Sequence, residues 1–181
     1  MKKLYTLICL TGIGIAASAQ SLYFNDDTGT PVSGTTVMVP GAPTDSDLHV
    51  YLELGNSSGT NLNVKVTRYE LSCISGTENY FCWAQCYGNL PACDGAWTQF
   101  PDPGDAQWAD YLPINAGSSW PADGNFFGAY LVPNGNTGTA TYRYVAFDAS
   151  DPNDSTWVDV QFDSAVGIDD EDNVVDFSDA Y

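Results

Sequence analysis

The sequence is poor in positive charge. It has five lysines and arginines against 23 aspartates and glutamates, with a single histidine, and its formal net charge is −18. Binding the phosphates of nucleic acids or of anionic membranes requires clustered Lys and Arg. The composition therefore excludes a nucleic-acid-binding function. It favours a soluble, self-repelling surface or one that binds cations, and structural calcium is the one cofactor it allows us to consider.

Only one apolar run approaches the length of a membrane span, and it lies at the N-terminus. Met1-Lys2-Lys3 precedes the uncharged run Leu4–Ala17, and Ala17-Ser18-Ala19 precedes Gln20. This is the pattern of a secretory signal peptide, residues 1–19, removed with Cys9 inside it. We therefore expect no membrane insertion and a protein that is secreted or held at the outer cell surface. Disulfides persist there.

A helical repeat is also missing. No segment has a 3.6-residue apolar period over ten residues, whereas short alternating runs recur between clusters of Gly, Pro, Asn, Asp and Ser. Five Trp, eleven Tyr and eight Phe show that the chain folds. The pattern predicts an all-β fold, an immunoglobulin-like antiparallel β-sandwich over residues 20–166, and an acidic linker or tail over 167–181. In one run, 139–147, four side chains are placed on a single face: Ala140, Tyr142, Tyr144 and Ala146.

Residues 73–120 interrupt this rhythm and are predicted to form an insertion. The stretch is rich in aromatic residues, and long irregular segments usually have a function or need covalent support. Four of its side chains are candidates for stacking on a ligand: Trp83, Tyr87, Trp97 and Trp108. The alternative is that these rings form a small core which packs the insertion onto the sheet.

The insertion also holds Cys73, Cys82, Cys86 and Cys93. An even number of cysteines in an exported protein predicts two disulfides, with three possible pairings. The alternative is a zinc site. The intervals between these cysteines match no common zinc ribbon and no histidine lies near them, so we predict no metal site.

Catalytic patterns are scarce, and we assign no catalytic residue. His49 is flanked by apolar residues in an alternating strand, and no G-x-S-x-G nucleophile elbow is present. Glu53 and Glu70 are the only strand glutamates that suggest carboxylate chemistry, as in a glycoside hydrolase. The acidic run 169–172 lacks the spacing of a calcium-binding loop. Asn56-Ser57-Ser58 is a formal glycosylation sequon.

Several segments together resemble an immunoglobulin-like domain of uncharacterised function in Bacteroidota proteins that are exported by the type IX secretion route. The resemblance spans about residues 45–165, and its segments are 61–70, 76–88 with Phe81-Cys82-Trp83 and Cys86-Tyr87, 138–144, 147–148 and 151–155. The resemblance implies a Cys82–Cys86 disulfide nested inside Cys73–Cys93. It also implies a C-terminal sorting domain after an acidic linker, whereas this sequence ends at Tyr181. Asp154-Ser155-Thr156 and Asp163-Ser164-Ala165 resemble the O-glycosylation triplet of these bacteria.

The sequence thus predicts a non-enzymatic interaction or adhesion module. Its expected partner is an extracellular protein or a polysaccharide, and its oligomeric state is not predicted. The alternatives are a carbohydrate-binding module that uses the aromatic insertion, or a hydrolase that uses acidic residues. Because the strands can bury their own apolar faces, we also expect the insertion, and not the sandwich, to depend on the disulfides.

Overall fold

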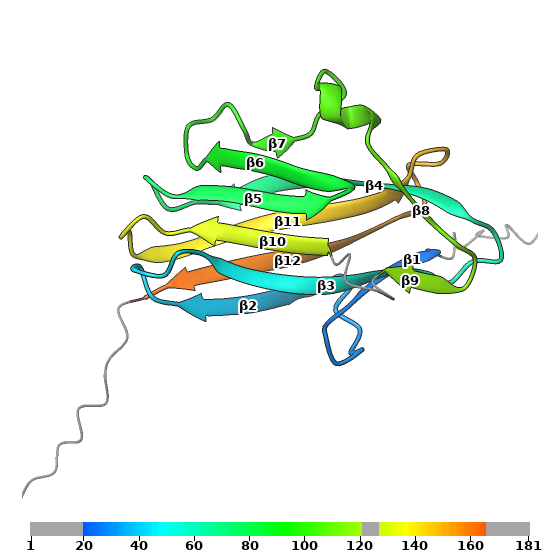
Figure 1. Cartoon of the computed structure of the whole chain (residues 1–181), viewed down its shortest axis with the longest axis horizontal. Helices are drawn as coiled ribbons and strands as arrows, with labels where there is room; N and C mark the ends of the chain where they lie inside the picture. Colours follow the sequence, from blue (N-terminus) through cyan, green and yellow to red (C-terminus); the bar gives the residue numbers. More distant parts are fainter. Residues whose placement is uncertain (1–19, 121–126, 166–181) are drawn as a thin grey trace, which may run out of the picture.

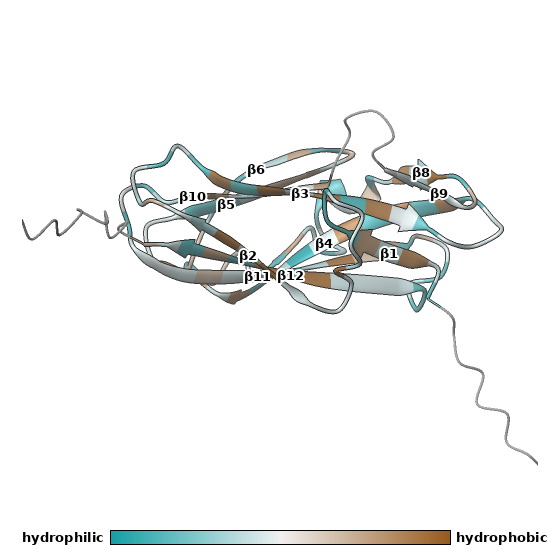
Figure 2. Ribbon diagram, turned by 90° about the horizontal axis from the view of Figure 1, so that it is seen from below, coloured by the Kyte–Doolittle hydropathy of each residue, from teal (hydrophilic) through white to brown (hydrophobic). Residues whose placement is uncertain are grey.

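The computed structural model describes residues 20–120 and 127–165, and these form two packed β-sheets (Figure 1). The predicted signal peptide and acidic tail lie outside the described residues. Figure 2 shows the two layers from the side, with β3, β5, β6 and β10 in one layer and β11 and β12 in the other. The predicted β-sandwich is confirmed. No helix in the described residues is both long enough and apolar enough to cross a bilayer.

We call the first layer sheet I. Its strand order is β1-β3-β10-β5-β6, and the short strand β9 also pairs with β3. All its pairs are antiparallel. The bounds are β1 Leu22–Asn25, β3 Leu48–Asn56, β5 Glu78–Trp83, β6 Gln85–Pro91, β9 Ser118–Trp120 and β10 Phe127–Val132.

The second layer is sheet II. Its order is β2-β12-β11-β4-β7, with β8 also paired to β4. The one parallel pair, β2 with β12, departs from the antiparallel pattern expected from the sequence. The bounds are β2 Thr36–Gly41, β4 Leu62–Ser72, β7 Gln99–Phe100, β8 Leu112–Ile114, β11 Gly138–Asp148 and β12 Ser155–Ser164, and a 3-10 helix, η1, spans Ala106–Ala109.

The core lies between the sheets and follows the period-2 pattern of the strands. On β11, the four side chains predicted to share a face are all fully buried. On β12, Val158, Val160 and Phe162 are fully buried as well. Burying a Val or Phe side chain contributes about 1.5–3 kcal/mol, so these two central strands supply much of the driving force for folding.

Tyr144 provides a test of this burial at high pH. It is fully buried, and loss of solvent raises its pKa from 10.0 to about 12. The unfolded chain therefore releases this proton at lower pH than the folded one. The corresponding stability is complete below pH 10 and is lost between about pH 10 and 12, by about 3 kcal/mol at 1.36 kcal/mol per pKa unit.

We therefore expect the free energy of unfolding, measured by urea denaturation followed by near-UV circular dichroism, to fall as the pH rises from 10 to 12, because the unfolded chain ionises Tyr144 at lower pH than the folded one. Tyr144→Phe removes the ionisable group and should reduce the alkaline loss of stability. Equal losses in the two proteins would contradict this assignment.

The stretch predicted as an insertion is tied into both sheets. β5 pairs with β10 and β6 in sheet I, while β7 and β8 pair with β4 in sheet II. Its core side chains include Phe81, Trp83, Tyr87, Phe100 and Ile114. The structure thus differs from the expected independence of this stretch, because its rings complete the sandwich core instead of forming a separate one.

Candidate functional site

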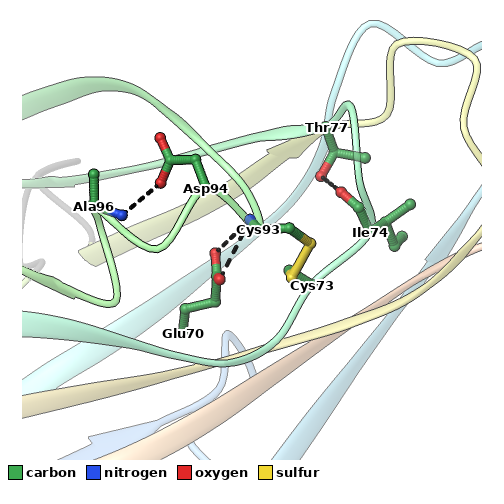
Figure 3. The surroundings of a disulfide bond; sticks show 7 residues. All are labelled: Glu70, Cys73, Ile74, Thr77, Cys93, Asp94 and Ala96. Atoms are coloured by element: carbon green, nitrogen blue, oxygen red, sulfur yellow. Dashed lines mark hydrogen bonds between the residues drawn. A yellow bond between two sulfur atoms is a disulfide. The ribbon is translucent and has the colours of Figure 1, made fainter.

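The four cysteines form the nested pairs Cys73–Cys93 and Cys82–Cys86. This confirms the pairing implied by the family resemblance, and it leaves no thiolate for the alternative zinc site. Figure 3 shows the surroundings of Cys73–Cys93, where the Glu70 carboxylate accepts a hydrogen bond from the Cys93 backbone N–H at 3.3 Å. The second pair closes the β5–β6 hairpin, with Cα atoms 3.9 Å apart.

Two of the four predicted ligand-binding rings lie inside the protein, which corrects the prediction for them. Trp83 is 2% exposed and its Nε1 donates to the Val64 carbonyl at 2.9 Å. Tyr87 is 3% exposed and packs 4.7 Å from Phe81, centroid to centroid. Both lie on the inward face of their strands, since each alternates with an outward cysteine. Neither can stack on a ligand at the surface.

Trp97 and Trp108 are half-buried. Trp97 packs edge-on against Phe100 with centroids 5.4 Å apart. Trp108 lies in η1. The Lys65 ammonium is 5.3 Å from the centre of its ring, and the Phe147 ring centroid is 5.7 Å from its own. Each ring thus has partners within the protein, and the structure does not bring the four predicted rings together as one surface.

The carboxylates considered for catalysis are also separated. Glu53 lies on β3 of sheet I and accepts a hydrogen bond from Asn25 at 2.9 Å, whereas Glu70 lies on β4 of sheet II. Within the described residues there is no group of three or more His, Cys, Asp or Glu that could hold a metal ion. A hollow of about 310 Å³ is lined by Pro40, Gly41, Ala42, Asp163 and Ala165, which do not form a recognisable catalytic set.

Two of the three glycosylation patterns coincide with buried side chains that have structural contacts. Asn56 is fully buried, and its amide donates to the Thr60 carbonyl at 2.8 Å. Ser164 is fully buried and donates to the Asn136 carbonyl at 2.8 Å. Neither side chain is accessible in the folded protein, so neither pattern is a modification site there.

The structure does gather a set of aromatic side chains that sequence analysis did not select. They stand on the outer face of sheet I, at positions that alternate with the buried residues of three neighbouring strands. We call this set the tyrosine face: His49 and Tyr51 of β3, Tyr130 of β10 and Tyr80 of β5. The register places Tyr130 directly between His49 and Tyr80.

The rings of the tyrosine face contact one another. Tyr80 and Tyr130 are stacked, with centroids 4.3 Å apart and planes 6° apart. Tyr51 meets Tyr130 edge-on at 6.0 Å, and His49 lies 5.2 Å from Tyr51. Cross-strand aromatic pairs stabilise a sheet by about 0.2–1 kcal/mol each. Tyr51 is nevertheless 41% exposed, so the set is open to solvent at this ring.

Gly128 sets the tilt of the central ring. It precedes Tyr130 by two residues on the same face, and a Cβ at this position would lie 2.9 Å from ring atoms of Tyr130. The absence of a side chain therefore lets Tyr130 lean along β10. Loss of solvent around this ring and its hydrogen bond to Tyr51 raise the pKa of Tyr130.

The charge around the tyrosine face is negative. Asp47 accepts a hydrogen bond from His49 Nδ1 at 2.7 Å, and this carboxylate helps to raise the pKa of Tyr80, second to desolvation. Glu78 of β5 and Glu53 of β3 alternate with buried residues and lie on the same outer face of sheet I as the tyrosines. The basic residues Lys65, Arg68 and Arg143 all lie in sheet II, and the strands of sheet I contain no Lys or Arg.

A signal for this site is present in the sequence but is incomplete. Alternation places each of the tyrosines on the outer side of its own strand, opposite apolar neighbours. The tyrosines at positions 51, 80 and 130 lie about 30 to 80 residues apart in the chain. Only the register of the three strands makes their rings adjacent.

Comparison with known proteins supports the fold. No family model matches the chain, and no curated protein matches it. The solved N-terminal domain of PorA is similar over 81% of this chain and 98% of that one, with a TM-score of 0.54 and 14% identity. A PapD-like domain of human CEP192 covers 92% of this chain and 99% of its own length, with a TM-score of 0.41 and 10% identity. Taken with the two sheets and their strand order, the likeness to the PorA domain identifies the fold of this chain as an immunoglobulin-like β-sandwich.

Proposed function

We propose that this protein is an exported, non-enzymatic interaction module that binds a protein partner through the tyrosine face. The observation that carries the proposal is the contiguous set of His49, Tyr51, Tyr80 and Tyr130 on the solvent side of sheet I. Exposed aromatic patches that are rimmed by polar residues are typical of protein-binding surfaces, and tyrosine is enriched there.

We propose that the protein acts outside the cell, at the outer cell surface or in the surrounding medium. The predicted signal peptide and the two disulfides both favour an oxidising compartment. The resemblance of residues 45–165 to Bacteroidota domains of the type IX route leads us to propose that the protein is exported, and acts in adhesion, in such a bacterium.

The arrangement of the rings favours a protein over a polysaccharide. A sugar ring stacks on a broad, open aromatic face. Tyr80 and Tyr130 instead cover each other's facing sides at 4.3 Å, so each ring keeps at most one uncovered face, and the pair also presents edges and hydroxyl groups outward. Hydroxyl groups and ring edges fit a protein surface that is partly polar and partly apolar. Binding of a polysaccharide is the other outcome that the test distinguishes.

The test is site-specific photo-crosslinking on intact cells. A benzoylphenylalanine side chain at Tyr51 is expected to crosslink to one discrete protein. The same side chain at Met38, which is 54% exposed on β2 of sheet II, is the matched control and should give no such product. Equal crosslinking at both positions, or none at Tyr51, would overturn the proposal.

Affinity electrophoresis in gels that contain polysaccharides separates the second class of partner. We expect no retardation of the protein. Retardation that is lost in Tyr80→Ser and retained in Met38→Ser would replace the protein partner with a polysaccharide at the same surface.

A further inference from the structure

Among the residues that the structure describes, Tyr130 is the one aromatic ring in contact with Tyr80. Strand β5 lies between β10 and β6 (Figure 1). Because Tyr130 of β10 stacks on one face of Tyr80, the opposite face of that ring is on the β6 side. The β5–β6 register shifts between Asn79 and Phe81, so Gly88 and Asn89 oppose Tyr80. A Cβ added at Gly88 would meet no heavy atom within 4 Å.

Two carboxylates lie in the neighbourhood of Tyr80. Glu78 lies two residues before Tyr80 on the same outward face of β5, and within the described residues no hydrogen bond or salt bridge engages its carboxylate. Asp47 is close enough to Tyr80 to raise the pKa of that ring's hydroxyl. Asp47 is paired with His49, whereas no Lys or Arg stands on the strands of sheet I to pair with Glu78.

A flat cation fits these features best. A guanidinium group is planar, stacks on aromatic rings and forms paired hydrogen bonds with carboxylates. The protein already uses this chemistry in sheet II, where Arg143 lies 3.8 Å from the Trp157 ring centre and donates to Asp159 at 2.8 and 2.9 Å. The ring and carboxylate on β5 offer the same pair of contacts without an arginine of their own.

We propose that Tyr80, Gly88 and Glu78 form a slot for an arginine side chain of the protein partner. The guanidinium stacks on the free face of Tyr80 above Gly88, and Glu78 accepts its hydrogen bonds. This inference rests on the proposed function, since it names the partner chemistry of the tyrosine face.

The probe is a blocked pentapeptide with one central arginine between glycines, compared with its lysine and citrulline counterparts. Binding to the intact protein is followed by NMR, through the Gly88 amide and the Tyr80 ring signals. The arginine peptide should shift both signals saturably. Because the exposed cation–π contact and the exposed ion pair are each equivalent to about a two- to fivefold change in affinity, the citrulline peptide should bind more weakly by at least that factor.

Variants separate the slot from general attraction to an acidic protein. Gly88→Val fills the open space at a strand position with no positive φ, and it should weaken arginine binding by about tenfold. Gly59→Val, also in open space, is the control and should change nothing. Tyr80→Phe should retain binding and Tyr80→Leu should lose it, while Glu78→Gln should weaken it about two- to fivefold.

The slot is overturned if the lysine peptide binds as well as the arginine peptide, or if Gly88→Val binds like the wild type. Failure of the slot and failure of the proposed function remain distinguishable. If the crosslinker at position 51 gives the same product in Gly88→Val as in the wild-type background, the protein-binding function stands without an arginine contact. If it gives no product in the wild-type background, both the proposed function and the slot are removed.

Discussion

Replacing Arg68 with alanine is expected to lower the free energy of unfolding by about 3–5 kcal/mol. This side chain of β4 is fully buried between the sheets. It donates to Asn79 Oδ1 at 2.8 Å and to the Trp97 carbonyl, and its guanidinium lies 5.1 Å from the Tyr142 ring centre. Alanine would leave a cavity, together with one buried and one partly buried acceptor without their donor. We expect this loss to outweigh the gain from no longer burying a charge.

The cost of this buried charge is visible in the structure. Among the described residues no carboxylate forms a salt bridge with Arg68, and its Nε has no hydrogen-bond partner. Burial lowers the pKa of its guanidinium, although Tyr144 and Tyr142 partly counteract the shift. Arg68→Met restores most of the volume, so it should lose less stability than Arg68→Ala and isolate the contribution of the two hydrogen bonds.

Urea unfolding followed by fluorescence measures these differences. Arg143→Ala is the matched control, because Arg143 also joins an aromatic ring and an acceptor but lies at the surface, with a side chain 35% exposed. Its loss should cost about 1 kcal/mol or less. Arg68→Ala within 1 kcal/mol of Arg143→Ala would contradict the structural role of Arg68.

Reduction of both disulfides is expected to lower the melting temperature by about 10–20 °C and to unfold the protein in a single transition. In the chain-entropy account the Cys82–Cys86 ring contributes about 2 kcal/mol and the Cys73–Cys93 loop about 3 kcal/mol. Their sum is a large share of the roughly 5–15 kcal/mol that stabilises a typical domain. The transition should be single because β5 and Trp83 belong to the sheet and to the core.

A single transition would replace the expectation drawn from the sequence, in which only residues 73–120 depend on the bridges. Near-UV circular dichroism and limited proteolysis of the reduced protein distinguish global unfolding from local unfolding of this segment. Cleavage confined to the segment 73–120, with the dichroism of the remaining core unchanged, would restore the independent insertion. The double variants Cys73→Ala/Cys93→Ala and Cys82→Ala/Cys86→Ala show which bridge is responsible, and the first should be the less stable of the two.

Sequence patterns were sufficient where the required contact is local to a strand. The alternation in 139–147 correctly predicts which side chains of β11 face the core, because successive residues of a strand point to opposite sides. The same rule applied to β5 would have placed Trp83 inward with Phe81. The aromatic richness of the stretch leaves two predictions open, an exposed binding surface or a small separate core, since no apolar period marks the stretch as a part of the sheet.

The pairing of the cysteines could be predicted only in part from the sequence. An even count in an exported chain indicates that bridges form, and the resemblance to known domains indicated which ones. Geometry accounts for the smaller ring, because Cys82 and Cys86 oppose each other across the β5–β6 hairpin. The larger bridge depends on the end of β4 reaching the segment after β6, which no local pattern encodes.

The sequence by itself determined the signal-peptide pattern, the β class, the even set of cysteines and the inward side of the alternating runs such as 139–147. The tertiary structure alone decided that Tyr51, Tyr80 and Tyr130 are neighbours, that Arg68 is buried, and that Gly88 and Asn89 oppose Tyr80. The physical reason is that a period-2 pattern relates a residue only to its own strand. Strand order and register are set by the joint packing of residues far apart in the chain, and therefore so are all contacts between strands.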